Sequence, residues 1–393
     1  MAETRLLLAT LAPAGPGAVE RVRSAAGEVR DWPQLLRLAG RHEVVALLHR
    51  GLAEAAYERL PAGILALLED TVRRQRDLGR RAWDELRELL ARFDSVGLAV
   101  MPFKGPVLAR LLYDDFGARV SHDLDFLVRA ADVPRVLAAI EAAGYTEPLH
   151  ARLTPAQAAA MRALYGELAF VHPGRMTIEP HWALAQSTQS IDLDCEEMWT
   201  RARSVRIDGV ELTVPAPEDL FLILVVHGSK EVWRRAKWVA DLVAFLRAEP
   251  TLDWALVIDR ARRAGILRMV HVGWLLAERA VAVEIPDAVR RSVEHDREAD
   301  RLASQIEGRL LTGDTDAPAI DRLSRFRWGL RERRRDRWRY AWRTLTTPRP
   351  RHFRMVRLPD RLIGAYVPLK IVHDYMFAPL VRLLRGTGGA PAS

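Results

Sequence analysis

The sequence predicts an α+β protein, in which a central segment of strands and helices lies between two helical regions. Three observations lead to this fold class. Helical periodicity runs from about residue 30 to 95, strand-like segments alternate with helices between 98 and 215, and helical periodicity returns at 216. The chain has 393 residues, of which 49% are hydrophobic and 28% charged, so it can build two or three hydrophobic cores.

These changes of pattern divide the chain into four predicted regions. The last region ends in a tail of small residues, "GTGGAPAS", which is typical of disorder. The four are a helical N-terminal region (1–95), a core of strands and helices (96–215), a helical domain (216–320), and a basic, Arg- and Trp-rich C-terminal region (321–393).

The N-terminal region contains two helical patterns, one that starts at Trp32 and a longer one that starts at Pro61. The first turn of a helix tolerates proline, because the N–H that proline lacks would have no partner there, and glycine often ends a helix. We therefore expect the long helix to begin near Pro61 and to stop near Gly97.

The central region alternates short apolar runs with amphipathic segments. Turn-forming residues lie where two pairs of these runs reverse, at "HPGR" and at "DG". The predicted elements are a strand at 98–105, a helix that opens on Pro106, a strand at 122–128, a helix at 131–145 that ends near Gly144, a hairpin at 166–182 and a second hairpin at 204–215.

The net charge of +8 and a pI near 10 indicate an affinity for anions, but the positive charge is unevenly distributed. Much of the excess lies between Arg322 and Arg357, whereas positive and negative residues are mixed elsewhere. The sequence therefore does not indicate a uniformly basic nucleic-acid-binding protein.

The apolar run near the N-terminus is too short and too weakly flanked for a secretory signal, and no stretch reaches the roughly 20 apolar residues of a spanning helix. We therefore expect a cytoplasmic protein. The single cysteine, Cys195, excludes an internal disulfide and a thiolate-rich zinc site. It lies beside Glu196 and Glu197 and lacks the positive surroundings that activate a thiol, so we expect a structural role.

Two aspartates, Asp123 and Asp125, lie two positions apart in the predicted strand "HDLDFLV". Both project from one face of the strand, while Leu124 and Phe126 fill the core on the other face. Like charges on one face repel, and strands disfavour Asp, so a compensating group is expected. The pair is either a binding edge for Mg²⁺, completed by substrate phosphates, or a solvated pair at a strand end.

The segment "FKGPVLARLLY" precedes the aspartates. Lys104 and Gly105 close a strand, and Pro106 starts a helix, so free backbone amides and the positive end of the helix dipole meet at one corner. Such a corner can hold a phosphate, and Lys104 adds a positive charge to it. We therefore expect a phosphate-binding corner next to the aspartates.

Two residues of the segment "TIEPHW" are further candidates. Glu179 ends the second arm of the first hairpin, where it is either a third carboxylate beside the pair or an exposed strand-end residue. His181 would lie on the same strand face, but Pro180 interrupts the ladder of hydrogen bonds. A packed or hydrogen-bonded His181 is therefore at least as well supported as a substrate contact.

Two more pairs of polar residues lie near the predicted site. Arg119 and Ser121 precede the aspartates in a loop, where a guanidinium suits a substrate phosphate and a surface Arg is the alternative. His227 and Lys230 share one face of a helix and can approach a triphosphate or a base from it. Both pairs are expected to contact nucleotide if the site exists.

The motifs occur in an order that resembles a known family, the uncharacterised bacterial nucleotidyltransferases of the DNA polymerase β-like superfamily. These proteins typically show a Lys-Gly corner, an Asp-hydrophobic-Asp strand, a Glu-x-His-Trp strand and a His-x-x-Lys helix followed by Trp-x-x-Asp. The resemblance covers most of the chain from about 30 to 385. It rests on "FKGPVLARLLYDDFGARVSHDLDFLVRAADVPRVLAAIEAAGY", "TIEPHWAL" and "PAPEDLFLILVVHGSKEVWRRAKWVADLVAFL".

The resemblance implies a polymerase β-like palm, which is a small mixed sheet with helices, flanked by helical regions. It assigns Lys104 and Gly105 to the phosphate corner, Asp123 and Asp125 to metal binding, and Glu179 to the third carboxylate. Two features depart from the wider superfamily. The usual Gly-Ser of the corner is Lys-Gly here, which removes a hydroxyl, and the third carboxylate is Glu rather than Asp.

The resulting hypothesis is a nucleotidyltransferase that uses Mg²⁺ or Mn²⁺ to move a nucleoside monophosphate from an NTP, with ATP the expected donor. The sequence leaves the acceptor open among small molecules, sugars, peptides and proteins. Alternatives are a catalytically silent member that binds or scaffolds nucleotide, and an adaptor that acts through the basic C-terminal segment. The predicted catalytic and metal-binding residues are Asp123, Asp125 and Glu179, and the predicted phosphate-binding residues are Lys104, Gly105, Arg119, Ser121, His227 and Lys230.

The basic segment 322–357 combines arginines with aromatic residues. It predicts a helix that ends before Pro348 and Pro350. Three roles are open: stacking on nucleic-acid bases, a weak contact with an anionic membrane surface, or packing of the Trp face on the protein. After an extended stretch, a final amphipathic helix is expected around 369–385.

Overall fold

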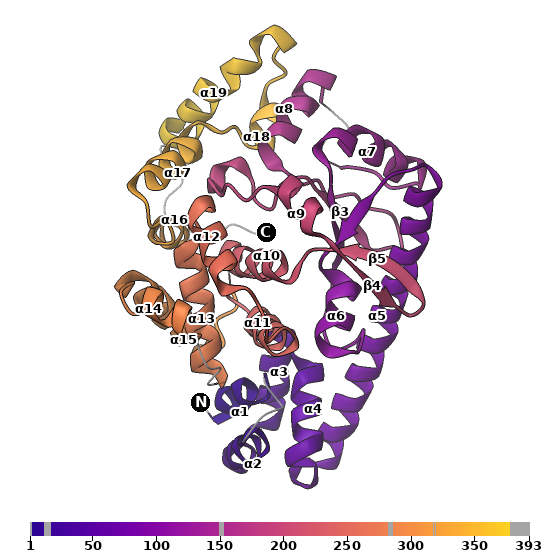
Figure 1. Cartoon of the computed structure of the whole chain (residues 1–393), viewed down its shortest axis with the longest axis vertical. Coiled ribbons are helices and arrows are strands. Elements are labelled where there is room, and N and C mark those ends of the chain that lie inside the picture. The colour runs from indigo at the N-terminus through magenta and orange to yellow at the C-terminus, as the bar shows by residue number, and fades with distance from the viewer. Residues whose placement is uncertain are drawn as a thin grey trace.

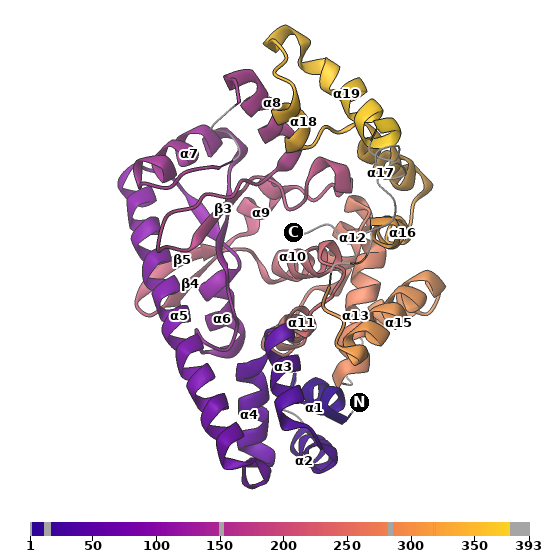
Figure 2. The same ribbon diagram turned by 180° about the vertical axis from the view of Figure 1, so that it is seen from behind.

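The chain folds as a mostly helical α+β protein with a small mixed sheet (Figure 1). The computed structural model describes residues 2–11, 17–148, 153–281, 286–316, 318 and 320–377. In Figure 1 the N-terminal helices α1–α4 lie at one end of the molecule and the C-terminal helices α17–α19 at the other, and the rear view in Figure 2 shows the same order.

The N-terminal region is helical, as its periodicity predicts. The long helix α5 starts directly after Pro61 and stops before Gly97, whose φ of +64° lies in the left-handed region that favours glycine. Asp31 caps α3 by accepting a hydrogen bond from the Gln34 amide. The helices are α1 (Ala2–Ala9), α2 (Ala18–Glu28), α3 (Trp32–His42), α4 (Val45–Ala55) and α5 (Ala62–Ser95), with a 3₁₀ turn at Tyr57–Arg59.

The main sheet has three strands in the order β1-β2-β3. The short strand β1 (Val100–Pro102) runs antiparallel to β2 (Asp123–Val128), and β2 runs parallel to β3 (Thr177–His181). The sheet is therefore mixed. The strand expected at 98–105 is present but shorter than predicted.

The hairpin expected at 166–182 is only partly formed. Its second arm is β3, whereas its first arm makes isolated bridges, with Glu167 opposite His181 and Phe170 opposite Ile178. The reason is that β3 finds a continuous partner in the buried strand β2, so the first arm is left with a few bonds at the edge of the sheet.

The hairpin expected at 204–215 is confirmed. Strands β4 (Arg203–Ile207) and β5 (Val210–Val214) pair antiparallel, with Ile207 opposite Val210. The two turn residues Asp208 and Gly209 have φ values of +45° and +83°. Positive φ at both central positions is typical of the two-residue turn that matches the twist of a hairpin.

Helices fill the rest of the central region. Helix α6 starts at Gly105 and has Pro106 in its first turn, as expected. Helices α8 and α9 were not predicted, although Thr154 and Gln157 form a capping box at the start of α8. The elements are α6 (Gly105–Tyr113), a 3₁₀ turn at Ala130–Asp132, α7 (Val133–Ala142), α8 (Pro155–Tyr165), the 3₁₀ turn η3 (Ser187–Gln189) and α9 (Cys195–Arg201).

The two faces of the sheet have different surroundings. Leu124, Phe126 and Ile178 point into an apolar core that includes residues of α5 and α7. On the opposite face, Leu127 packs in a smaller cluster with Ile223 of α10. Helix α10 therefore lies against the face from which Asp123 and Asp125 project.

Helices continue from residue 217, as the periodicity predicts. One continuous apolar core contains residues of α1–α4 as well as residues of α10–α16, so the two ends of this helical part pack on each other. The division of the chain into four regions stays a prediction. The helices are α10 (Pro217–Lys230), α11 (Ala236–Ala248), α12 (Trp254–Ala264), α13 (Leu267–Val281), α14 (Asp287–Val293), α15 (Arg297–Thr312) and α16 (Ile320–Gly329).

The single helix predicted before Pro348 is divided into α16 and α17, because the helix is interrupted between Gly329 and Arg334. Helix α17 buries Asp336 and Tyr340, whereas Trp338 and Trp342 are 70% and 66% exposed. The predicted alternative in which the Trp face packs on the protein is therefore wrong for Trp338 and Trp342. The elements are α17 (Arg334–Thr346), α18 (Pro350–Met355), the 3₁₀ turn η4 (Asp360–Ala365), α19 (Tyr366–Val372) and the π-helical turn η5 (His373–Phe377).

Two expectations for the C-terminus differ from the structure or lie beyond it. The stretch after α17 is not extended throughout, because α18 forms there on Pro350. The final helix begins at Tyr366, and its predicted part beyond 377, like the tail expected to be disordered, lies outside the described residues. None of the helices that the structure describes combines the length and the apolar content needed to cross a membrane.

Candidate functional site

Three predicted carboxylates lie together on one face of the sheet. The parallel register sets Asp125 opposite Glu179 and Asp123 opposite Thr177. Paired residues of neighbouring strands, and residues two apart in one strand, share a face. Asp125 is buried, and Asp123 and Glu179 are partly buried on the same face of the sheet.

Two basic side chains contact one oxygen of Asp125. Lys104 Nζ donates to Asp125 Oδ1 at 2.6 Å, and His181 Nε2 lies 3.0 Å from the same atom. Burial opposes ionisation of Asp125, but Lys104 and then His181 outweigh it and hold the pKa well below its usual range. Asp125 Oδ2 is buried with no partner.

The other two carboxylates are less well compensated. Burial, followed by the charge of Asp125, raises the pKa of Asp123 and raises the pKa of Glu179 to about 7. An additional cation at this edge would remove the repulsion. Oxygen and nitrogen atoms of Asp125, Glu179 and His181 lie within 4.8 Å of one another, which is a spacing that suits metal binding.

This set differs from the predicted one by one residue. The sequence indicated Asp123, Asp125 and Glu179, whereas the geometry adds His181 to the close group and leaves Asp123 beside it. The unpartnered Asp125 Oδ2 and the two weakly compensated carboxylates fit a hard divalent cation.

The predicted corner lies next to the backbone of Asp123. Gly105 has a φ of +60°, and a Cβ at this position would approach the backbone oxygen of Asp123 to 3.3 Å. Helix α6 starts here, so its free amides face the same region. Lys104 turns its side chain to Asp125, where Asp125 and Asp123 overcome the effect of burial and raise the pKa of Lys104.

A buried chain of charges continues from Asp125 to α10. His181 Nδ1 lies 3.1 Å from Glu167 Oε2, and Lys230 Nζ lies 3.3 Å from the same oxygen. Burial disfavours the charged form of Glu167, but His181 and then Lys230 outweigh it and lower the pKa to about 2. The sequence analysis left His181 open between a packed or hydrogen-bonded role and a substrate contact, and the structure shows the hydrogen bond. The sequence analysis missed Glu167.

Arg119 and Ser121 lie beside the site, but the Arg119 side chain is engaged. Its Nε donates to Asp241 Oδ2 at 2.9 Å, its Nη1 donates to Ser121 Oγ at 3.3 Å, and Tyr113 donates its hydroxyl to the other Asp241 oxygen at 3.0 Å. The buried Arg119–Asp241 pair ties the loop before β2 to helix α11. Contact of Arg119 with a phosphate stays a prediction.

His227 lies on the side of α10 that faces the site, and it is neutral. Burial, followed by the positive charges of Lys104 and Lys230, lowers the pKa of His227 well below its usual value. Its Nε2 accepts a hydrogen bond from Trp238 Nε1 at 3.1 Å. His227 therefore offers hydrogen bonds rather than a positive charge.

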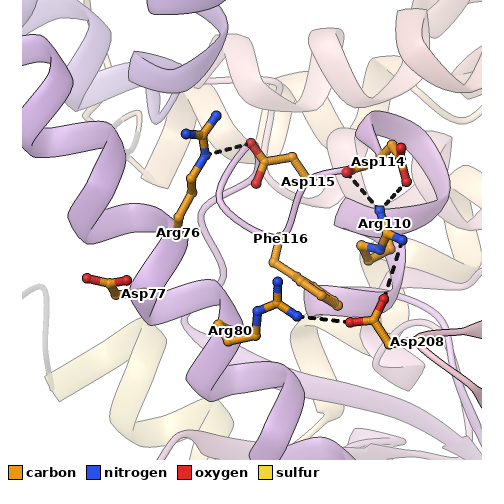
Figure 3. Close-up of a pocket in the computed structure, with 8 residues that line it drawn as sticks. All are labelled: Arg76, Asp77, Arg80, Arg110, Asp114, Asp115, Phe116 and Asp208. Atoms are coloured by element: carbon orange, nitrogen blue, oxygen red, sulfur yellow. Dashed lines mark hydrogen bonds and ion pairs between the residues drawn. The ribbon is translucent and has the colours of Figure 1, made fainter.

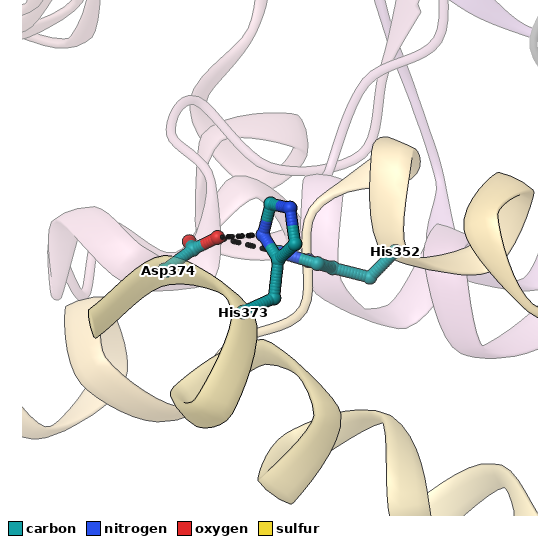
Figure 4. A group of neighbouring side chains, drawn as sticks. All are labelled: His352, His373 and Asp374. Atoms are coloured by element: carbon teal, nitrogen blue, oxygen red, sulfur yellow. Dashed lines mark hydrogen bonds and ion pairs between the residues drawn. The ribbon is translucent and has the colours of Figure 1, made fainter. Parts of the chain in front are cut away.

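A second group of metal-type ligands lies in the C-terminal region, where Asp374 faces His352 and His373 (Figure 4). His352 Nδ1 accepts a hydrogen bond from the Arg349 amide, so the proton of the neutral ring lies on Nε2, 3.0 Å from Asp374 Oδ1. His373 and Arg351 bind the same oxygen. Asp374 therefore joins α18 to η5 through hydrogen bonds and an ion pair with Arg351, and the proton on His352 Nε2 opposes metal binding by that nitrogen.

A pocket at the far end of α6 contains several arginines, but each is paired with an aspartate (Figure 3). Arg76 binds Asp115, Arg80 binds Asp208, and Arg110 binds both Asp114 and Asp208. Because these charges are neutralised within the pocket, and because Gly105 starts the opposite end of the helix, this pocket is separate from the carboxylate site.

Comparison with known proteins gives one match. A model of the family described as uncharacterised nucleotidyltransferase matches residues 28–282, which is well over half of the chain and includes the whole carboxylate site. The comparisons with curated proteins and with solved structures gave no match. The order of the motifs, the carboxylates on adjacent strands and the extent of the match agree, and the chain belongs to this uncharacterised nucleotidyltransferase family.

Proposed function

We propose that the protein is a metal-dependent nucleotidyltransferase that moves a nucleoside monophosphate from an NTP, with ATP the expected donor, to an acceptor. One observation supports the proposal most strongly. In a chain of this family, Asp125 and Glu179 face each other on adjacent strands beside Asp123, and a buried oxygen of Asp125 has no partner. The sheet around them would be a polymerase β-like palm.

Asp123, Asp125 and Glu179 would hold Mg²⁺ or Mn²⁺. The bound ion would neutralise charge on the phosphate oxygens and lower the pKa of the attacking hydroxyl. His181 would orient Asp125 through the contact at 3.0 Å, because Mg²⁺ prefers oxygen ligands over imidazole.

The chain's own residues would position the triphosphate. Lys104 and the free amides at the start of α6 would hold phosphate oxygens, and Gly105 would let them approach. Lys230 and Ser121 would contact the triphosphate as well, and Lys230 would keep its contact with Glu167. Lys104 also forms an ion pair with Asp125, at 2.6 Å between Nζ and Oδ1.

The test combines binding with turnover. Purified protein is melted with ATP, GTP, CTP or UTP in the presence of Mg²⁺ or Mn²⁺, and pyrophosphate release is measured with pools of acceptors. We expect one NTP to raise the melting temperature only with metal, and Asp123→Asn to abolish this rise. Asp84→Asn, which alters an exposed aspartate of α5, is the control and should respond like the parent. No rise with any NTP in the parent would refute the proposal.

A catalytically silent family member is the first alternative. Such a protein would show the metal-dependent rise in melting temperature but release no pyrophosphate with any acceptor pool. The intact set of three carboxylates favours the active form, since a protein that only binds nucleotide has less need of all three.

A weak contact with an anionic membrane surface is a second candidate activity, and the exposed face of α17 favours it. Arg334, Arg335, Trp338 and Trp342 share this face, and Trp328 of α16 meets Trp338 edge to face at 6.3 Å. Exposed Trp beside Arg is typical of helices that rest on lipid headgroups.

Co-sedimentation of the full chain with vesicles tests this contact. Binding to phosphatidylserine-containing vesicles but not to phosphatidylcholine alone is expected, and Trp338→Ala with Trp342→Ala should remove it. Tight binding of single-stranded oligonucleotides together with weak vesicle binding would assign the face to nucleic acid instead.

A further inference from the structure

A second cavity lies next to the charge chain that leads to Asp125. Its volume is about 340 Å³, and its walls come from α8, η3, α16, α17 and the start of α18. In both ribbon views α8, α17 and α18 lie at the end of the molecule opposite α1–α4 (Figures 1 and 2). We name it the α16–α17 pocket.

The lining of the α16–α17 pocket is rich in hydrogen-bonding groups and positive in charge. Tyr165, Tyr340, Thr344 and other side chains supply hydroxyls, and two glutamines supply amides. Arg327 and Arg349 also line it, and none of the lining residues that the structure describes is acidic. These arginines therefore differ from those of the pocket in Figure 3, where aspartates neutralise each one.

Buried donors around the pocket lack partners. Arg327 Nε and both Nε and Nη1 of the fully buried Arg331 have no acceptor. In contrast, Nη2 of Arg327 donates to the Lys230 carbonyl, and Nη2 of Arg331 donates to the Gln189 carbonyl. The Arg331 guanidinium lies 5.4 Å from the centre of the Tyr340 ring, directly behind the pocket wall. Burial lowers the pKa of Arg331 to about 10, so it remains charged at neutral pH.

Buried guanidinium nitrogens without an acceptor are unfavourable unless an anion or another acceptor compensates them. Arg331 and Arg327 add positive potential to a cavity that has no acidic lining residue among those described. A bound anion would remove this cost, and arginine forks suit phosphate and carboxylate groups in particular. The hydroxyl and amide groups around the anion site suit a ligand with several hydroxyls.

A series of residue-to-residue contacts connects the pocket to the carboxylate site. Arg327 Nη2 donates to the Lys230 carbonyl at 3.3 Å, and Lys230 Nζ binds Glu167, the residue next to His181. Tyr165 lines the pocket two positions before Glu167. Lys230, Glu167 and His181 therefore connect Arg327 of the pocket to Asp125.

We propose that the α16–α17 pocket binds a small anionic molecule that bears hydroxyl groups, such as a sugar phosphate or a sugar acid, and that this ligand is the acceptor. The acceptor part rests on the proposed function. In that step an acceptor hydroxyl oxygen bonds to the α-phosphorus of ATP, the bond from that phosphorus to the bridging oxygen breaks, and pyrophosphate leaves. The hydroxyl proton passes to a carboxylate of the site.

Isothermal titration of the full chain tests the binding part without any turnover. The probes are glucose 1-phosphate, ribose 5-phosphate, glycerol 3-phosphate and glucuronate, with glucose as the neutral comparison. At least one anionic probe should bind, and glucose should bind at least tenfold more weakly or not at all. Comparing the affinity for the sugar phosphates with the affinity for glucuronate shows whether the pocket prefers a phosphate or a carboxylate group. Absence of binding by every anionic probe, or equal binding of glucose, overturns the proposal.

Variants locate the binding. Arg327→Gln and the exposed Arg349→Gln should each weaken the anionic probe at least tenfold. Arg322→Gln changes an exposed arginine of the same helix α16 that does not line the pocket, and it should bind like the parent. Equal losses in Arg322→Gln and Arg327→Gln would mean that surface charge alone attracts the probe, which overturns the pocket assignment.

Turnover tests the acceptor part separately. With ATP and metal, the bound probe should stimulate pyrophosphate release, and Arg349→Gln should raise the KM for the probe while leaving ATP binding unchanged. Asp123→Asn should still bind the probe but release no pyrophosphate. Probe binding in the parent without any pyrophosphate release, in a protein that binds ATP with metal, overturns the acceptor role and leaves the pocket in place. Loss of ATP binding itself would instead contradict the proposed function.

Discussion

Replacing Asp123 and Asp125 by Asn in turn should change the stability of the metal-free protein in opposite directions. The two carboxylates are two positions apart on β2, yet their surroundings differ. Asp125 has Lys104 and His181 on one oxygen, and its pKa is lowered. Asp123 has a raised pKa, because burial and the charge of Asp125 both disfavour its ionised form.

The magnitude for Asp125 follows from its burial. The side chains of Lys104 and Asp125 are 9% and 0% exposed, so the ion pair is nearly dry. Removing one partner of such a pair costs about 3–5 kcal/mol, because the remaining charge is left uncompensated. Asn keeps a carbonyl that can accept from Lys104, so we expect the lower end, about 3 kcal/mol, which corresponds to a fall in melting temperature of roughly 4 °C for a chain of this length.

The sign for Asp123 is the reverse. Because the pKa of Asp123 is higher in the folded than in the unfolded protein, the protein loses stability as the pH rises and Asp123 ionises. At neutral pH, Asp123→Asn removes an unfavourable charge and keeps the shape. We therefore expect an unchanged or higher melting temperature for this variant.

Thermal melts at pH 7 in the presence of a chelator measure both changes, and a second series with Mg²⁺ and ATP measures the ligand response. Both variants should lose the stabilisation that metal and nucleotide give the parent, because bound ligand stabilises in proportion to its affinity. An Asp125→Asn protein that melts as high as the parent without metal would refute the Lys104–Asp125 pair as a stabilising contact. A clear loss in Asp123→Asn would refute the charge argument.

Three further changes test the surroundings of the site. Lys104→Ala should weaken ATP binding by about 1.5–3 kcal/mol, the range of a hydrogen bond to a charged group, and calorimetry at fixed Mg²⁺ should show it; unchanged affinity would remove Lys104 from the phosphate corner. Gly105→Val should destabilise the fold by about 2 kcal/mol or more in urea denaturation, because a β-branched residue is strained at a φ of +60°; the control Gly63→Ala lies in an open helical position and should be nearly neutral. Glu167→Gln should lower stability at pH 7. The folded-state pKa of Glu167 is about 2, below the ordinary value of a glutamate, so the stability that its charge contributes is lost as the pH falls, and the difference between variant and parent should shrink between about pH 5 and 3. A difference that stays constant with pH would contradict the ion pairs of Glu167 with His181 and Lys230.

Much of the carboxylate site could be predicted because its parts are local. The alternation along β2 places Asp123 and Asp125 on one face and Leu124 and Phe126 in the core, and this follows from the geometry of any strand. A glycine before a proline likewise indicates a sharp turn into a helix, and Gly105 has the positive φ that such a turn requires. Long periodic helices such as α5 are predicted for the same reason.

Contacts between distant segments were harder to predict. Glu167 was missed, although the predicted hairpin held the signal, because a turn centred on Gly174 sets Glu167 opposite His181. The pairing of Arg119 with Asp241, a residue on α11, was not predicted, and its contact with a phosphate stays a prediction. The partner of Arg119 does not follow from local pattern, because this pairing depends on how helix α11 docks beside the sheet.

The sequence by itself determined the fold class, the helical and strand segments with strong periodicity, and the residues that could bind metal and phosphate, since these depend on residue type and short spacing. Only the tertiary structure decided which charges compensate one another, because burial and distances of a few ångströms set that balance. Lys104 neutralises Asp125, whereas Asp123 and Glu179 keep raised pKa values. The same holds for the α16–α17 pocket, whose walls come from two parts of the chain more than 130 residues apart and meet only when helices far apart in sequence pack together.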